Sequence, residues 1–401
     1  MLSRILILIF YSGLVYTAEP VRVGILDTTI NPDHPSLSRY FERNTDEISG
    51  NARDDDGNGF IDDFIGYSPG IDCHQEIPLI RDPDIDERED FQDFVTAVNA
   101  YQDLRGISKW RAKKEFKKFY RQIPEEDREL FNEYITQSHG SHVANIALRG
   151  TNAKLFPISF NEHATDLDPD DYEQEIISPP GMILTKADKE ILREALVSER
   201  DYLKKLSTYI KAKNLDVVNM SIGSDFAGAK IAMYISILYK RAEKRQLIPP
   251  NPLLLMARAR RLARALIVNK TKLWEEMTKE NPDTLFVAAA SNDGKNLRYY
   301  PSSVAKIDSP NTLIVGALNS EGKIASFSNR SRKHVDVYTR GTAVESTSYQ
   351  GGELLMSGTS QATPAITNLS VRIKEKFPDL TPSQIKQKII DCEGVPERCG
   401  V

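Results

Sequence analysis

The stretch VRVGILD at residues 21–27 is a short run of alternating apolar residues that closes on the carboxylate of Asp27. Comparable runs recur along the chain, with segments of helical period between them. Strands that alternate with helices in this way are typical of α/β proteins with a mostly parallel sheet. We therefore expect a mostly parallel central sheet flanked by helices. Further strands are expected at 216–220, 285–289 and 313–317.

Amphipathic helices are expected between these strands. Apolar residues spaced by three and four predict a helix over roughly 88–105. Pro124 and the acidic residues after it suit the start of a helix over 125–137. The capping box TPSQ at 381–384 starts a helix over 384–390. Further helices are expected at 108–122, 191–210 and 228–246.

Composition indicates a large globular chain. Its 401 residues, 40% of them hydrophobic, can fill one large core or two modest ones, which excludes fibrous and wholly disordered proteins. Lys and Arg total 52 against 57 Asp and Glu, so no global basic field favours nucleic-acid binding. The basic stretch at 257–272 lacks aromatic residues and carries an apolar face. It is either a helix face packed on the core or a contact site for a partner or an anionic surface.

The first residues carry the features of an export signal. Arg4 precedes an apolar run over 5–16, which is shorter than the roughly 20 residues that cross a membrane. We expect a signal peptide over 1–18, cut after Ala18 or Thr17, and an exported protein that is secreted or periplasmic. The alternative is an N-terminal strand or buried helix. Arginines break the later apolar stretches, so no stable membrane insertion is expected.

Three cysteines in so long a chain exclude a fold built on disulfides. In an exported protein, Cys392 and Cys399 can close a small loop near the C-terminus. Cys73 is then left over, as a free thiol or as an intermolecular link.

Two residues carry the first signs of chemistry. Asp27 ends its strand at the sheet edge where α/β proteins place their sites, although an aspartate there can also be a turn former or helix cap. His139 lies in SHGSHVANIA, residues 138–147, where Gly140 and Ser141 allow close approach and a tightly packed helix is expected to begin at Val143. The His-x-x-His pair could instead bind a metal, but no cysteine or carboxylate lies near it at ligand spacing.

Ser360 lies in MSGTSQATPAI, residues 356–366, a Gly-Thr-Ser turn followed by a helix. We expect Pro364 in the first turn of that helix. A hydroxyl at a helix N-terminus lies near free N–H groups that stabilise developing negative charge. The alternative is an ordinary N-cap serine, which leaves the surrounding small residues unexplained.

The order Asp27, His139, Ser360 and several local strings resemble the subtilisin-like serine proteases, or subtilases, across most of the chain. VGILDTTINPDHPSL, SHGSHVANIA and SGTSQATPAI are similar to the family's aspartate, histidine and serine motifs. VVNMSIGS resembles the strand that lines its substrate cleft, FVAAASNDG resembles its oxyanion-hole segment, and FSNRSRKHVDVYTRG resembles the strand pair before the serine. The resemblance implies a three-layer subtilisin-like fold.

The same resemblance implies roles for these residues. Ser360 would attack the scissile carbonyl, His139 would act as general base, and Asp27 would hold the imidazole. Asn292 and the backbone N–H of Ser360 would form the oxyanion hole, and His142 would be structural. The chemistry implied requires no cofactor, and polypeptides are the expected substrates. Backbone groups would bind the substrate as an added strand at Ser221, Ile222 and Gly223.

The resemblance implies one catalytic domain over 19–401, with helical insertions at about 83–137 and 228–280. We expect an insertion to serve as a lid, a brace or a docking surface for a protein partner; the alternative is surface decoration. Exported subtilases usually carry a folded propeptide, whereas here the first strand follows the expected signal almost directly. Thr339-Arg340-Gly341 also departs from the family's Ala-Pro-Gly. Thr29 and Ser291 stand where the family has glycine, so we expect strained backbone at both.

The string DDDGNGFIDD at 54–63 has the spacing of a calcium loop. Oxygen-bearing side chains and a glycine fall at its positions 1, 3, 5, 6 and 9, but Ile65 occupies position 12, where glutamate is usual. We expect a structural calcium ion here, with an acidic turn as the alternative. The expected ligands are Asp54, Asp56, Asn58 and Asp62.

Two functions remain open at the level of the sequence. One is an active exported serine endopeptidase that works through an acyl-enzyme. The other is a catalytically silent subtilase used for binding or scaffolding, suggested by Thr29, Ser291 and the expected lack of a propeptide. A lipase or esterase of the α/β-hydrolase type is disfavoured, because the Gly-x-Ser-x-Gly elbow is missing and the triad order differs.

Overall fold

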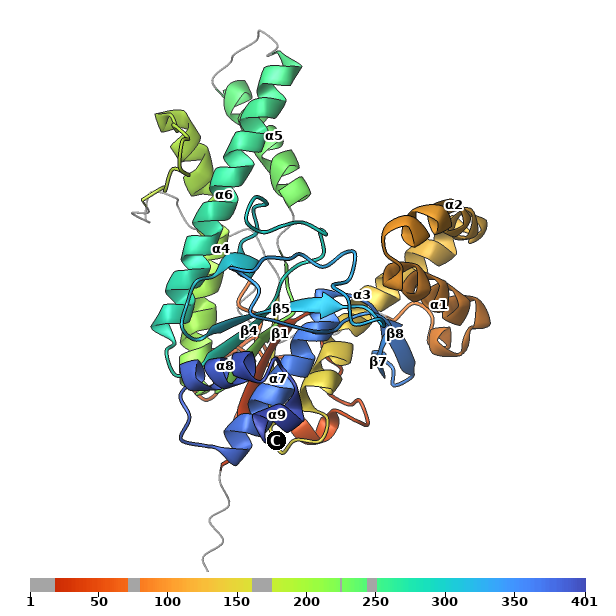
Figure 1. Ribbon diagram of the computed structural model, residues 1–401. Helices are drawn as coiled ribbons and strands as arrows, with labels where there is room; N and C mark the ends of the chain where they lie inside the picture. The colour runs from red at the N-terminus through yellow and green to blue at the C-terminus, as the bar shows by residue number, and fades with distance from the viewer. Residues whose placement is uncertain (1–18, 71–79, 161–174, 224–225, 244–250) are drawn as a thin grey trace, which may run out of the picture.

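The computed structural model describes residues 19–70, 80–160, 175–223, 226–243 and 251–401. The expected signal peptide and Cys73 lie outside these residues. A sheet of six strands, in the order β2-β1-β3-β4-β5-β6, forms the centre of the molecule, and all its pairings are parallel (Figure 1). The expected α/β fold with a mostly parallel central sheet is confirmed. The strands are β1 (Arg22–Asp27), β2 (Lys154–Ser159), β3 (Val217–Met220), β4 (Leu285–Ala289), β5 (Thr312–Leu318) and β6 (Val337–Arg340).

Helices cover both faces of this sheet and make it the middle of three layers (Figure 1). Alternation along β1 divides its side chains, since Leu26 joins the core on one face while Val23 and Ile25 join the core on the other. The first face is covered by α4 (Lys186–Ala212), α5 (Phe226–Glu243) and α6 (Pro252–Glu280). The second is covered by α3 (Glu125–Leu148), α7 (Thr359–Lys376) and α8 (Pro382–Asp391).

The segment expected as the first insertion, called the first insertion below, shares a small core with the hairpin of β7 (Val344–Thr347) and β8 (Glu353–Met356). It contains η2 (Ile85–Glu87), α1 (Glu89–Asp103), α2 (Gly106–Gln122) and the first half of α3, and it lies beside this hairpin (Figure 1). Phe91, Phe94 and Phe131 are buried together with Leu354 and Met356 of the hairpin. The insertion therefore packs on the segment that leads to Ser360.

Helix α3 is longer than the sequence pattern indicated. The helix expected over 125–137 and the helix after His139 are one continuous element. A side chain at Gly140 would lie 2.4 Å from the carbonyl oxygen of Thr28, so its glycine permits the contact with the end of β1 and does not end the helix.

The second insertion, α5 and α6, extends from the body as a long hairpin (Figure 1). The basic stretch at 257–272 lies in α6 with its apolar face buried, and Arg258 and Arg261 both pair with the buried Asp188. The helix face packed on the core is thus the correct alternative for this part of α6. Among the described residues, no helix combines the length and the apolar character that crossing a membrane requires.

Three details differ from the sequence-based expectations or complete them. Strand β2 was missed because it contains Pro157; a proline is tolerated there since β2 is an edge strand. The string FSNRSRKHVDVYTRG contributes one strand, β6, and not a pair; the hairpin before Ser360 is β7–β8, which follows that string.

Cys392 and Cys399 form a disulfide between α8 and α9 (Pro396–Cys399). The remaining short elements are η1 (Ser38–Tyr40) and η4 (Val304–Lys306).

Candidate active site

Asp27 and His139 meet although they are 112 positions apart. Nδ1 of His139 lies 2.6 Å from Oδ1 of Asp27, whose side chain is buried at the carboxyl end of β1. The backbone N–H of Thr28 donates to the same oxygen at 2.7 Å. Its hydroxyl in turn accepts the N–H of Gly140, which ties α3 to the end of the strand. The fold thus fixes the orientation of the imidazole from both sides.

Two opposing effects set the charge state of His139. Burial disfavours the imidazolium, but the negative charge of Asp27 and the hydrogen bond to it prevail and raise the pKa of His139. His142 has the opposite environment. Burial lowers its pKa to about 3, and its Nε2 contacts the carbonyl oxygens of Leu354 and Val344 at 3.0 and 3.2 Å. These contacts agree with the structural role expected for His142.

Ser360 lies at the second position of α7, at the helix N-terminus. Its hydroxyl donates to the carbonyl oxygen of Ser221 at 3.1 Å. Among the described residues, Ser360 and His139 share no hydrogen bond. The expectation that Pro364 lies in the first turn is wrong, since it lies inside the helix, in the second turn. Having no N–H, Pro364 leaves the carbonyl of Ser360 free of an intrahelical partner, and the hydroxyl of Ser221 donates to that carbonyl at 2.9 Å.

Asn292 lies against the turn before Ser360. Its Oδ1 accepts the backbone N–H of Thr359 at 2.9 Å and the Thr359 hydroxyl at 3.0 Å. This pair of bonds directs Nδ2, the donor atom, toward the turn, where a side chain built on Gly358 would lie 3.4 Å from it. A side-chain N–H donor is therefore held beside the turn that carries Ser360.

The expected backbone strain occurs at one of two positions. Ser291 has φ of 69°, in the left-handed region that favours glycine, whereas Thr29 is outside that region. The side chain of Ser291 is buried, and its hydroxyl has no hydrogen-bond partner among the residues that the structure describes. The residue therefore carries both a strained backbone and an unsatisfied polar atom.

The expected substrate-binding residues lie next to the nucleophile. Ser221 and Ile222 are buried and Gly223 is exposed at the end of β3. A cavity of about 580 Å³ opens beside Ile222 and Gly223 and is lined by residues of the second insertion and its neighbours, including the ion pair of Glu199 and Lys270. Those from α5 and α6 include Ala229, Ala232, Met233, Leu266 and Trp274.

Several contributing residues carry no sequence signal of their own. Asn219 donates to the hydroxyl of Ser221 at 2.9 Å and accepts the hydroxyl of Thr367 at 2.8 Å, so a buried polar chain links α7 to β3. Thr28 and Thr359 act in the same way through their contacts with Asp27 and Asn292. Only their place within the quoted motifs, next to the expected site residues, pointed to these three residues.

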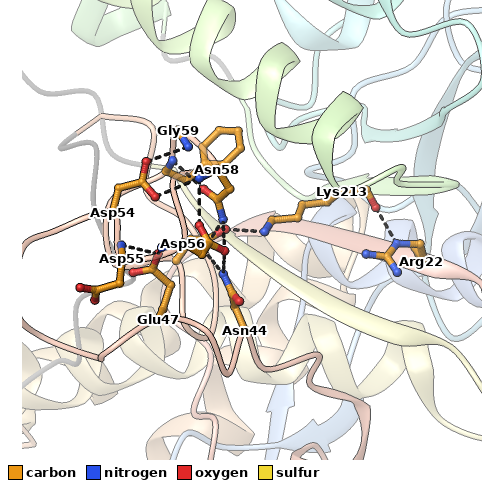
Figure 2. Close-up of polar contacts among 11 residues, drawn as sticks. Arg22, Asn44, Glu47, Asp54, Asp55, Asp56, Asn58, Gly59 and Lys213 are labelled. Atoms are coloured by element: carbon orange, nitrogen blue, oxygen red, sulfur yellow. Dashed lines mark hydrogen bonds and ion pairs between the residues drawn. The ribbon is translucent and has the colours of Figure 1, made fainter.

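The acidic loop adopts a different arrangement from the one expected (Figure 2). The carboxylate of Asp62 lies against residues 50–52, where it accepts the backbone N–H groups of Gly50, Asn51 and Ala52. Asn58 directs its Nδ2 toward Asp56 at 2.9 Å, and its Oδ1 accepts the N–H of Phe60. The side chains of Asp62 and Asn58 are thus engaged in hydrogen bonds within the loop.

A third carboxylate, that of Glu47, lies close to those of Asp54 and Asp56. One oxygen each from Glu47, Asp54 and Asp56 lies within 4.8 Å of the others, which is compatible with oxygen ligation of a calcium ion. Glu47 is only 4% exposed, and its Oε2 is buried without a hydrogen-bond partner among the described residues. Burial, followed by the charges of Asp56 and Asp63, raises the pKa of Glu47. Its place outside the string 54–63 is why the spacing did not reveal it.

The fold and site define a three-layer α/β protein with an aspartate–histidine pair between β1 and α3 and a serine at the N-terminus of α7, which packs against α3. The family model described as "Subtilase family" matches residues 19–400. The chain belongs to the subtilase family.

Individual relatives match only in part. The thermostable alkaline protease of Halalkalibacterium halodurans is 33% identical over 110 residues, 27% of this chain and 28% of that protein. Subtilisin E of Bacillus subtilis is 33% identical over 106 residues, 25% of this chain and 26% of that protein. The matches thus span about a quarter of the length of these relatives. A crystal structure of a cold adapted subtilisin-like serine proteinase aligns over 93% of this chain and 81% of its own, at 15% identity and a TM-score of 0.40.

Proposed function

We propose that this chain is a serine endopeptidase that hydrolyses polypeptides through Ser360, His139 and Asp27. The observation that carries the proposal is the 2.6 Å contact between Nδ1 of His139 and the buried carboxylate of Asp27. That contact fixes the tautomer whose free Nε2 can take a proton. Ser360 lies at the N-terminus of α7, the helix that packs against α3, which carries His139. Membership of the family supports the same chemistry.

In this mechanism the Ser360 hydroxyl turns from the carbonyl of Ser221 toward Nε2 of His139. Its oxygen bonds to the scissile carbonyl carbon while its proton passes to Nε2. The C–N bond then breaks as the imidazolium returns that proton to the leaving amine, which leaves an acyl-enzyme. Water repeats the sequence and releases Ser360. Asp27 stays ionised throughout and stabilises the imidazolium.

The developing oxyanion needs donors that are already in place. Nδ2 of Asn292 and the backbone N–H of Ser360 fill this role in the proposal. Loss of one such side-chain donor costs about 2.7–4 kcal/mol of transition-state stabilisation in subtilisin. The substrate backbone would pair with residues 221–223, and one of its side chains would enter the adjoining cavity.

We place this activity outside the cytoplasm. A disulfide joins Cys392 and Cys399, and disulfides persist in oxidising compartments. The apolar run at 5–16 supports export by a cleaved signal.

A fluorophosphonate probe tests the proposed activity against the silent-scaffold alternative. The folded wild type should be labelled and should cleave a denatured protein substrate, whereas Ser360→Ala should do neither. Asn132→Ala, on the exposed side of α3, is the control and should match the wild type. A folded wild type that is neither labelled nor active would refute the enzyme and favour the scaffold.

For the acidic loop, we propose a structural calcium ion held by Glu47, Asp54 and Asp56. The ion would offset most of the negative charge of the three carboxylates and would take no part in the reaction. Two observations support it: the convergence of three oxygens and the unpartnered, buried Oε2 of Glu47.

Thermal melting with and without millimolar calcium tests this site. Wild type should melt at higher temperature with calcium, and Glu47→Gln should lose that response. Asp55→Asn is the control, because its carboxylate bonds to Ile48 and Asn51 outside the cluster and its loss should preserve the response. A wild-type melting temperature that calcium leaves unchanged would count against the site.

A further inference from the structure

One face of α1 contacts the segment that carries Ser360. Asn99 is 4% exposed and lies in the helix, where its Nδ2 donates to the carbonyl oxygen of Leu355 in β8 at 2.8 Å. Its Oδ1 accepts the hydroxyl of Ser357 at 2.5 Å. Ser357 is three residues before Ser360, so this side chain holds the approach to the nucleophile through two different bonds.

Asp103 lies one helical turn further along the same face. Its carboxylate accepts the hydroxyl of Thr342, the hydroxyl of Ser320 and, at 2.9 Å, the backbone N–H of Ser320. Burial opposes its ionisation, but these hydrogen bonds prevail and lower the pKa of Asp103. A charged acceptor therefore fixes the loops after β5 and β6.

The two held segments contact each other directly before the nucleophile. The N–H of Gly358 donates to the carbonyl oxygen of Gly341 at 2.8 Å, and the N–H of Ala343 donates to the hydroxyl of Ser357 at 2.9 Å. The fit is tight, since a side chain at Gly341 would lie 2.7 Å from the carbonyl oxygen of Gly358. A shift of either segment would therefore move the turn that carries Ser360.

We propose that Asn99 and Asp103 are positioning residues, through which the first insertion sets the location of the Ser360 hydroxyl. The inference rests on the proposed peptidase function and deepens it. Neither residue touches the substrate; each acts through the chain segments that flank Gly358. The insertion is then a brace of the active site and not surface decoration.

The decisive variant is Asn99→Leu, which keeps the size of the side chain and removes both bonds. We expect kcat to fall by about 10- to 100-fold, the effect of misplacing a catalytic group by about 1 Å. KM should stay within about a factor of two, since substrate binding is untouched. The rate of fluorophosphonate labelling should fall with kcat.

Two further variants separate positioning from folding. Ser357→Ala removes the partner hydroxyl, which also accepts the N–H of Ala343. The double variant should lose less kcat than the product of the two single losses, because both changes break the Asn99–Ser357 contact. Asn99→Asp keeps the acceptor for Ser357 and should recover part of the lost kcat. Asn132→Leu, in the same insertion but remote from the hairpin, should match the wild type. If Asn99→Leu fails to fold, the kcat of Ser357→Ala and Asn99→Asp decides.

The outcomes distinguish this inference from the proposed function. A folded wild type without labelling would overturn both. A labelled wild type, together with a folded Asn99→Leu that keeps wild-type kcat or changes only in melting temperature or KM, would overturn the positioning role alone.

Discussion

Ser291 offers a direct test of how this family of folds tolerates a side chain where glycine is usual. Its φ of 69° and its buried, unpartnered hydroxyl are both unfavourable. The change to make is Ser291→Gly, which removes the Cβ and the hydroxyl together. The backbone carbonyl of Ser291 would still accept the N–H of Asn329 at 3.0 Å, so the local main chain should keep its geometry.

The expected gain follows from three terms. Relief of the left-handed conformation contributes about 1–2 kcal/mol. Removal of a buried hydroxyl without a partner contributes about 1–3 kcal/mol. The greater freedom of glycine in the unfolded chain subtracts about 0.5–1 kcal/mol. We therefore expect Ser291→Gly to raise the free energy of unfolding by about 2 kcal/mol.

Urea unfolding of wild type and variant measures this difference. Asn214→Gly is the matched control, because Asn214 has φ of 47° far from the site and asparagine tolerates this region well. Its stability should change by less than about 0.5 kcal/mol. If Ser291→Gly is less stable than the wild type, the reasoning from strain and the unpartnered hydroxyl is wrong.

The other predictions concern charge and covalent closure. The rate constant kcat/KM should rise with pH through the raised pKa of His139, because only the neutral imidazole accepts a proton. In a pH–rate series, Asp27→Asn should move this transition to lower pH and reduce kcat by about 10⁴-fold. The free energy of unfolding should fall by about 2 kcal/mol between pH 7 and pH 5, because the pKa of His142, about 3, lies below that of a histidine in the unfolded chain. In urea unfolding, His142→Gln should lack this fall. Equal pH dependence of the unfolding free energy in wild type and His142→Gln would contradict the prediction. Replacing Cys392 and Cys399 by serine should lower the free energy of unfolding by about 2 kcal/mol, as expected for a short closed loop, and an unchanged urea midpoint would argue against it.

Local patterns were sufficient for much of the fold. Alternation in residues 21–27 predicted β1. The strands β1, β3, β4 and β5 formed as expected because each is short, largely apolar and buried on both faces. Edge strand β2 escaped the pattern because Pro157 argues against a strand, and only its place at the edge makes it acceptable. Helix α3 was divided in the prediction, since nothing in the sequence shows that Gly140 meets the backbone of Thr28.

The site was harder to predict from the sequence than the fold, because its contacts join residues that are far apart in the chain. The motif spacing pointed to Asp54 and Asp56. Glu47 lies beside them because the loop folds back, and the spacing of a motif carries no information about that fold. The contacts of Asn99 with Leu355 and Ser357 join residues more than 250 positions apart. Such pairs carry no local signal, so they become visible only in three dimensions.

Helix α3 links the first insertion to both halves of the site. Phe131 in its first half is buried in the small core of the insertion, while Val143 in its second half is buried in the main core, and His139 lies between them. Because a helix transmits displacement along its axis, any shift of the insertion core would reach the imidazole as well as the turn held by Asn99. A chain shortened by residues 83–135 would lose part of the element that carries His139 and the contacts that hold Ser357. In the proposed mechanism, an insertion placed in this way would constrain the base and the nucleophile together, which surface decoration would not do.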